Sequence, residues 1–194
     1  MLKQMGLLIS TAASLPMAAR PQARAQALPA LGEALISLTS DEAETLRSII
    51  ARIVPADENG PGALEARADR FIDRALAGTL KSQREVYRAG LAAIDAEARS
   101  AKGASFAKLG AIDQDSILTA MQTTPFFTLV RNHTIQATFC DPFYGGNHNF
   151  AGWNLIGYPG ARIAVSANLQ RIDTKPEPSG KSAYDYGMFN KAEF

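Results

Sequence analysis

The chain has 194 residues, of which 46% are hydrophobic and 20% charged, and its formal net charge is +1. This length and composition fit one globular domain with a core of its own and exclude a disordered chain. A nearly neutral chain without a basic block is not expected to bind nucleic acid, nor an anionic membrane surface directly.

The first 27 residues have the pattern of an export signal. Lys3 precedes an apolar run from Met5 to Ala19, no acidic residue occurs, and Ala25-Gln26-Ala27 forms an A-x-A cleavage signal. The opening MLKQMGLLISTAA resembles the end of a twin-arginine signal whose arginine pair is missing. Either the true start lies upstream or the chain uses another route. We expect a signal peptide at residues 1–27, a linker at 28–38 and a periplasmic mature protein.

Five helices are predicted in the mature chain. The first begins at the capping box formed by Thr39 and Glu42 and ends at Pro55. The others cover about residues 63–77 and 82–99, or begin near Asp113 and near Pro125. Residues at helical spacing are expected to form the core: Leu46, Ile49, Ile50, Ile53, Ala66, Phe71, Ile72, Ala75, Leu76, Tyr87, Leu91, Ile94, Ala98, Ile117, Leu118, Met121, Phe126, Val130, His133 and Ala137.

β-type patterns are few, and the best of them, RIAVSANL at residues 162–169, is short. We therefore predict an all-α fold, a single compact bundle of about five main helices with a long irregular Gly/aromatic-rich C-terminal segment. The helical domain is expected over residues 39–169. The polar, Pro/Gly-punctuated residues 170–194 are expected to form an extended tail that wraps a surface or a partner.

Glycines and aromatic residues are concentrated in residues 140–160, CDPFYGGNHNFAGWNLIGYPG. This stretch also holds the sole cysteine and one of two histidines. A nucleophilic site would need Cys140 activated by His133 or His148. His133 lies seven residues before Cys140, but the Asp141-Pro142 step opposes a helix long enough to join them. A buried, hydrogen-bonded role suits His133 better, and no thiolate-favouring surroundings are evident for Cys140. We predict no catalytic residue.

Cofactor and metal sites are also not expected in this chain. His148, Asp141 and Asn147 fall short of the usual ligand number for a metal, and one cysteine cannot hold an iron–sulfur cluster. Neither a phosphate loop, nor a G-x-G-x-x-G fingerprint, nor a C-x-x-C-H haem motif occurs.

The glycines and aromatics of residues 140–160 leave two interpretations. The loop folds back and fills its own helical core with Trp153 and Phe143, or it presents aromatics to another protein. Both can hold together, some rings facing inward and others outward.

The loop carries a resemblance to a known family. DPFYGGNHNFAGWNLIGYPG is similar to the Asp-Pro-x-Tyr-Gly-Gly-Asn and Gly-Trp-x-x-x-Gly-Tyr-Pro-Gly elements of the small subunit (subunit 3) of membrane-bound gluconate 2-dehydrogenases. The stretches IIARIVPADENGPGALEARADRFID, YRAGLAAIDAEA and FAKLGAIDQDSIL resemble the same family, so the likeness covers most of the mature chain.

The resemblance implies an exported accessory subunit that is not catalytic on its own. Its implied partners are a large FAD-bearing subunit, which oxidises a sugar acid or polyol, and a multihaem cytochrome c. The chain itself would carry no cofactor, and it would meet the membrane only through the complex.

The alternatives are a free-standing periplasmic enzyme using Cys140 or His148, and a transient export escort. The expected partner-binding residues are Cys140, Asp141, Phe143, Tyr144, Gly145, Gly146, Asn147, His148, Trp153 and Tyr158.

Overall fold

The computed structural model describes residues 34–174 and 176–190, so the expected signal peptide at 1–27 lies outside the described residues. Within them the chain forms seven α-helices, several short 3-10 turns and no strand. The predicted all-α fold is confirmed, with the first five helices as its main elements. The helices are α1 Ser40–Ile53, α2 Ala68–Ala77, α3 Arg84–Lys102, α4 Ala111–Met121, α5 Pro125–Phe139, α6 Ala151–Leu155 and α7 Gly187–Asn190.

Local signals place the ends of several helices as the sequence predicts. The capping box before α1 is present, because the Thr39 N–H donates to Glu42 Oε2 at 2.8 Å and the Glu42 N–H donates to Thr39 Oγ1 at 3.3 Å. Pro125 occupies the first turn of α5, where its missing N–H costs no helical hydrogen bond. Gly103, with a φ of 74°, ends α3 in the left-handed conformation.

The predicted start of the second helix is wrong, because α2 begins at Ala68 rather than near residue 63. Residues 63–67 form turns, and Arg67 has left-handed backbone angles (φ 55°, ψ 40°) that interrupt a helix. The turn instead buries Ala63 and Ala66, and the Ala63 N–H donates to the carbonyl of Val54 at 2.9 Å. The apolar residues of this turn are therefore spaced as they would be in a helix, although they form a tight turn.

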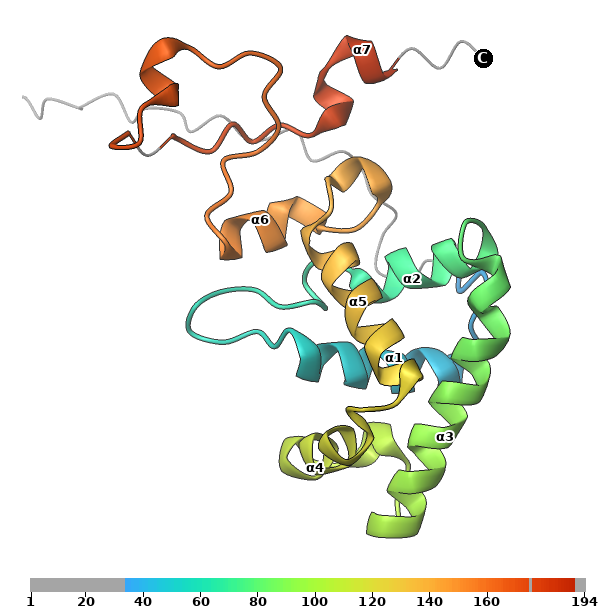
Figure 1. The fold of residues 1–194 in the computed structure, drawn as a ribbon. Helices are drawn as coiled ribbons and strands as arrows, with labels where there is room; N and C mark the ends of the chain where they lie inside the picture. The colour runs from blue at the N-terminus through green and yellow to red at the C-terminus, as the bar shows by residue number, and fades with distance from the viewer. Residues whose placement is uncertain (1–33, 175, 191–194) are drawn as a thin grey trace, which may run out of the picture.

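The core lies where α5 packs against α1, α2 and α3. In Figure 1, α5 runs through the middle of the bundle, α4 lies at one end, and the C-terminal segment lies at the other. Most of the predicted core residues are buried, among them Ile50, Leu91 and Val130. Five of them are half-buried at the edge of the core instead: Ile53, Phe71, Ala75, Met121 and Phe126.

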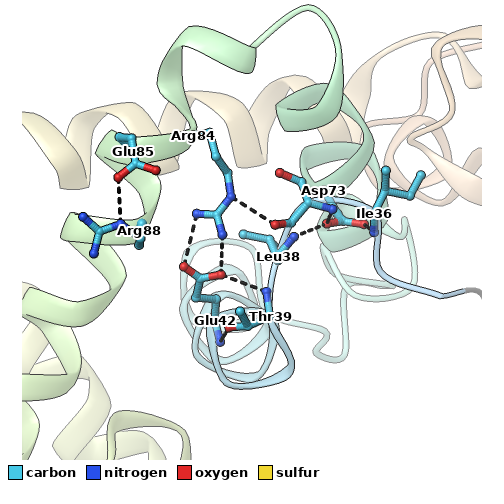
Figure 2. Close-up of polar contacts among 9 residues, drawn as sticks. Ile36, Leu38, Thr39, Glu42, Asp73, Arg84, Glu85 and Arg88 are labelled. Atoms are coloured by element: carbon cyan, nitrogen blue, oxygen red, sulfur yellow. Dashed lines mark hydrogen bonds and ion pairs between the residues drawn. The ribbon is translucent and has the colours of Figure 1, made fainter.

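The described chain begins with an anchored segment (Figure 2). The buried carboxylate of Asp73 on α2 accepts the three successive N–H groups of residues 36–38, at 2.8, 2.9 and 2.8 Å. Arg84 on α3 pairs with Glu42 at 2.6 Å and donates through Nε to the carbonyl of Ser37 at 3.0 Å. These bonds tie the end of the expected linker to α2 and α3.

Every helix within residues 34–174 and 176–190 is too short or too polar to span a bilayer.

Candidate partner-binding site

Residues 140–160 close the C-terminal end of α5. The last carbonyls of a helix lack intrahelical partners and need other donors. The Asn147 N–H donates to the carbonyl of Ala137 at 2.8 Å, and Trp153 Nε1–H donates to that of Phe139 at 2.9 Å. The Asn147 amide also donates through Nδ2 to the carbonyl of Cys140 at 2.8 Å. The loop thus supplies the donors that the end of the helix requires.

Asn147 organises the inside of the loop. Its side chain is fully buried, its backbone is left-handed (φ 46°, ψ 44°), and its Oδ1 accepts the N–H of Gly152 at 2.8 Å. Asparagine tolerates this conformation better than most residues. Gly146 and Gly152 lie so close to α5 that a Cβ at either position would overlap a backbone carbonyl, that of Ala137 and that of Thr138.

Asp141 joins the loop to the C-terminal segment. The Asp141 carboxylate accepts the N–H of Phe143 at 2.8 Å and, through both of its oxygens, the N–H of Ala183 at 3.2 and 3.1 Å. Gly145 follows with a φ of 90°, and its carbonyl accepts a hydrogen bond from the Arg74 guanidinium of α2. The loop is therefore tied to α2 on one side and to residue 183 on the other.

The aromatic side chains divide between the two interpretations of the loop. Trp153 is buried against the end of α5, and Phe143 is half-buried with its ring beside that of Tyr184 in the C-terminal segment. Neither ring belongs to the core that the helices form. Tyr144 and Tyr158 are 68% and 45% exposed. They are held by ring contacts, because Tyr144 meets Phe143 at a centroid distance of 5.4 Å and Tyr158 meets Trp153 at 4.8 Å. The loop both fills its own interior and presents tyrosines at the surface.

Cys140 lies in surroundings that favour the thiol. Burial raises the pKa of Cys140 to about 11, so the thiolate that a nucleophile requires is scarce at neutral pH. Its Sγ–H donates to the carbonyl of Ala137 at 3.6 Å. Helix α5 ends before Cys140, which agrees with the helix-breaking effect predicted for Asp141-Pro142.

The two histidines have other surroundings. His133 is buried, and its Nδ1 lies 2.8 Å from the Tyr87 hydroxyl, which confirms the predicted hydrogen-bonded core role. Burial lowers the pKa of His133. Burial and, after it, the charge of Arg67 lower the pKa of His148, so both imidazoles favour the neutral form. Among the described residues, no hydrogen bond joins Cys140 to either imidazole.

No group of three or more His, Cys, Asp and Glu side chains gathers in a metal-binding arrangement within residues 34–174 and 176–190. The ten predicted site residues do lie together in one loop. The sequence does not predict the contacts that reach the loop from elsewhere in the fold, those of Arg74, Ala183 and Tyr184. The Tyr184 ring lies 4.5 Å from that of Phe143. The Asp-Pro step could have indicated a side-chain cap at Asp141, but no local signal points to residue 183.

The fold and the loop define the chain as a small all-α domain closed at one end by a Gly- and aromatic-rich loop. The family model of gluconate 2-dehydrogenase subunit 3 matches residues 40–160, and the chain belongs to that family. Membership implies an accessory subunit of that dehydrogenase complex. Comparisons with curated proteins and with solved structures found no match.

Proposed function

We propose that this chain is the non-catalytic small subunit of a periplasm-facing flavoprotein dehydrogenase complex. It supports the export, folding and assembly of a large FAD-bearing subunit that oxidises a sugar acid or polyol. A multihaem cytochrome c subunit receives the electrons. FAD and haem c belong to those partners, and the complex provides the association with the outer face of the cytoplasmic membrane.

The observation that carries this proposal is the family match over residues 40–160, which includes α1 to α6 and the whole loop. The raised pKa of Cys140 favours an accessory role over a thiol enzyme, since the thiolate is the reactive form. The exposed tyrosines supply a protein-binding surface, because aromatic rings with a polar tip are enriched at interfaces.

We further propose that the loop residues have two roles in binding. Tyr144 and Tyr158 touch the flavoprotein, since both are exposed and both rest on rings that are more buried. The other predicted residues shape and support this surface from within: Cys140, Asp141, Phe143, Gly145, Gly146, Asn147, His148 and Trp153. Binding that favours the folded flavoprotein stabilises it by mass action, so a non-catalytic chain can determine the activity of the complex.

The test is purification of the tagged chain from its native envelope, with identification of the bound chains and a visible spectrum. We expect a large flavoprotein, flavin absorption and c-haem absorption. A colourless chain purified alone would contradict the proposal and favour the transient escort. Activity of the isolated chain without flavin would favour the free-standing enzyme.

Paired variants test the surface itself. The double variant Tyr144→Ala/Tyr158→Ala should retain its helical circular dichroism and reduce flavoprotein recovery by about tenfold or more, as expected when aromatic anchors are lost. The matched control is Ile112→Ala on α4, since Ile112 is also exposed but belongs to the opposite end of the molecule (Figure 1). If the two variants recover equal amounts of flavoprotein, Tyr144 and Tyr158 do not belong to the interface.

A further inference from the structure

The C-terminal segment leaves the partner-binding loop and then returns to it. The Ser179 N–H donates to the carbonyl of Pro159 at 2.6 Å, and the Ala161 N–H donates to that of Lys181 at 3.1 Å. In Figure 1 the segment lies at the same end of the bundle as α6. We call residues 179–186 the clasp. It lies beyond the residues that the family model matches, yet it is bonded to the end of the loop that the model includes.

A second set of contacts joins the clasp to the start of the loop and fixes Tyr184 there. The Ala183 N–H donates to both carboxylate oxygens of Asp141, at 3.2 and 3.1 Å. A hydrogen bond to a carboxylate is stronger than one between neutral groups. Ser182 is buried, and its hydroxyl accepts the N–H of Tyr184 at 3.2 Å. The ring of Tyr184 then lies 4.5 Å from that of Phe143.

Two exposed tyrosines therefore rest on one supporting ring. Tyr144 is 68% exposed and meets Phe143 at a centroid distance of 5.4 Å, whereas Tyr184 is 39% exposed and meets the same ring from the clasp. Aromatic rings with a polar tip are enriched at protein interfaces. Tyr184 thus extends, from a distant part of the sequence, the exposed aromatic surface that begins at Tyr144.

We propose that Tyr184 is a further contact residue for the large FAD-bearing subunit and that Asp141 positions it, an inference that rests on the function proposed above. The flavoprotein is the expected occupant because Tyr184 and Tyr144 share one supporting ring, so a partner that covers Tyr144 also reaches Tyr184. The clasp fixes Tyr184 before binding, so its contact costs little conformational entropy. Asp141 acts through the backbone of residue 183 rather than by touching the partner.

The test is photo-cross-linking within the native complex. Tyr184 is replaced by the photoreactive aromatic residue p-benzoylphenylalanine in the tagged full chain, the complex is irradiated, and mass spectrometry identifies the chain that is captured. We expect a cross-link to the flavoprotein. The same residue at position 112 is the matched control, since Ile112 is also exposed but lies on α4 at the opposite end of the molecule, and we expect no cross-link there (Figure 1).

Ala183→Pro tests the positioning role of Asp141. Proline removes the N–H that Asp141 accepts, and the extended backbone of Ser182 (φ −108°, ψ 179°) tolerates a proline after it. Amide exchange at Tyr184 should become faster. The cross-link from position 184 should fall about fivefold for each flavoprotein bound, as expected for the loss of one hydrogen bond. Normalising to bound flavoprotein separates positioning from a general loss of binding.

The outcomes separate this inference from the proposed function. A complex that contains the flavoprotein but gives no cross-link from position 184, or one to the cytochrome chain or to a second copy instead, overturns the inference and leaves the accessory role standing. Equal cross-linking from positions 184 and 112 also overturns it. An unchanged cross-link in Ala183→Pro overturns the role of Asp141. If the unmodified chain brings down no flavoprotein, both the inference and the proposed function are wrong.

Discussion

Replacement of Asn147 tests whether the loop depends on its buried amide. Asn147→Ala leaves the N–H of Gly152 and the carbonyl of Cys140 without their partners, each now bonded at 2.8 Å. An unsatisfied buried group costs about 1–3 kcal/mol. Alanine in the left-handed conformation adds about 1 kcal/mol. We therefore expect the free energy of unfolding to fall by about 4 kcal/mol, a large part of the total for a domain of this size.

A matched control lies two residues away. Asn149 is also left-handed (φ 53°), but its side chain is exposed. Asn149→Ala should lose only the conformational part, about 1 kcal/mol. The difference of about 3 kcal/mol between the two variants isolates the hydrogen bonds of the buried amide.

Urea unfolding of the mature chain measures both variants. Circular dichroism follows the helices, and fluorescence of Trp153, the sole tryptophan, follows the loop. With a urea dependence of about 2 kcal/mol per molar, the midpoint of Asn147→Ala should fall by about 2 M. A difference between the two variants below about 1 kcal/mol would refute the assigned role of Asn147.

Three further predictions follow from single contacts. Gly152→Ala should reduce the free energy of unfolding by about 2 kcal/mol, since its Cβ would overlap a carbonyl of α5. Gly110→Ala has open space around it and should cost only about 1 kcal/mol, because alanine is a poorer N-cap for α4 than glycine; thermal unfolding compares the two variants. Asp73→Asn replaces one accepting oxygen by a donor, so it should cost about 2 kcal/mol and speed amide exchange at residues 36–38. The pKa of Cys140 rises on folding from 9.0 to about 11, so its contribution to stability should be constant below pH 9 and be lost from pH 9 to 11. Cys140→Ala should remove that part of the decline in urea unfolding measured across this pH range.

Sequence reasoning succeeds here where the signal is local. The capping box of Thr39 and Glu42 and the helix start at Pro125 depend on neighbours within a few residues, and both are present. The predicted start of α2 is wrong because it, too, depends only on neighbouring residues. The turn before Arg67 has the apolar spacing of a helix. The hydrogen bond from Ala63 back to the carbonyl of Val54 at the end of α1, which the apolar spacing does not indicate, accompanies the turn.

The candidate site shows the same limit. Its location in residues 140–160 follows from composition, but the direction of each aromatic depends on what lies behind it. Trp153 turns inward because the carbonyl of Phe139 accepts its indole N–H. The partners of Asp73, and the bond from Ala183 to Asp141, are 35 to 42 positions away in sequence, and no motif specifies such pairs.

The loop has most of its order before a partner binds. The loop is fixed from inside by Asn147 and Trp153, so the exposed Tyr144 and Tyr158 lose little conformational freedom on binding. In the proposed complex the loop therefore provides a rigid contact surface whose shape is set before the flavoprotein binds.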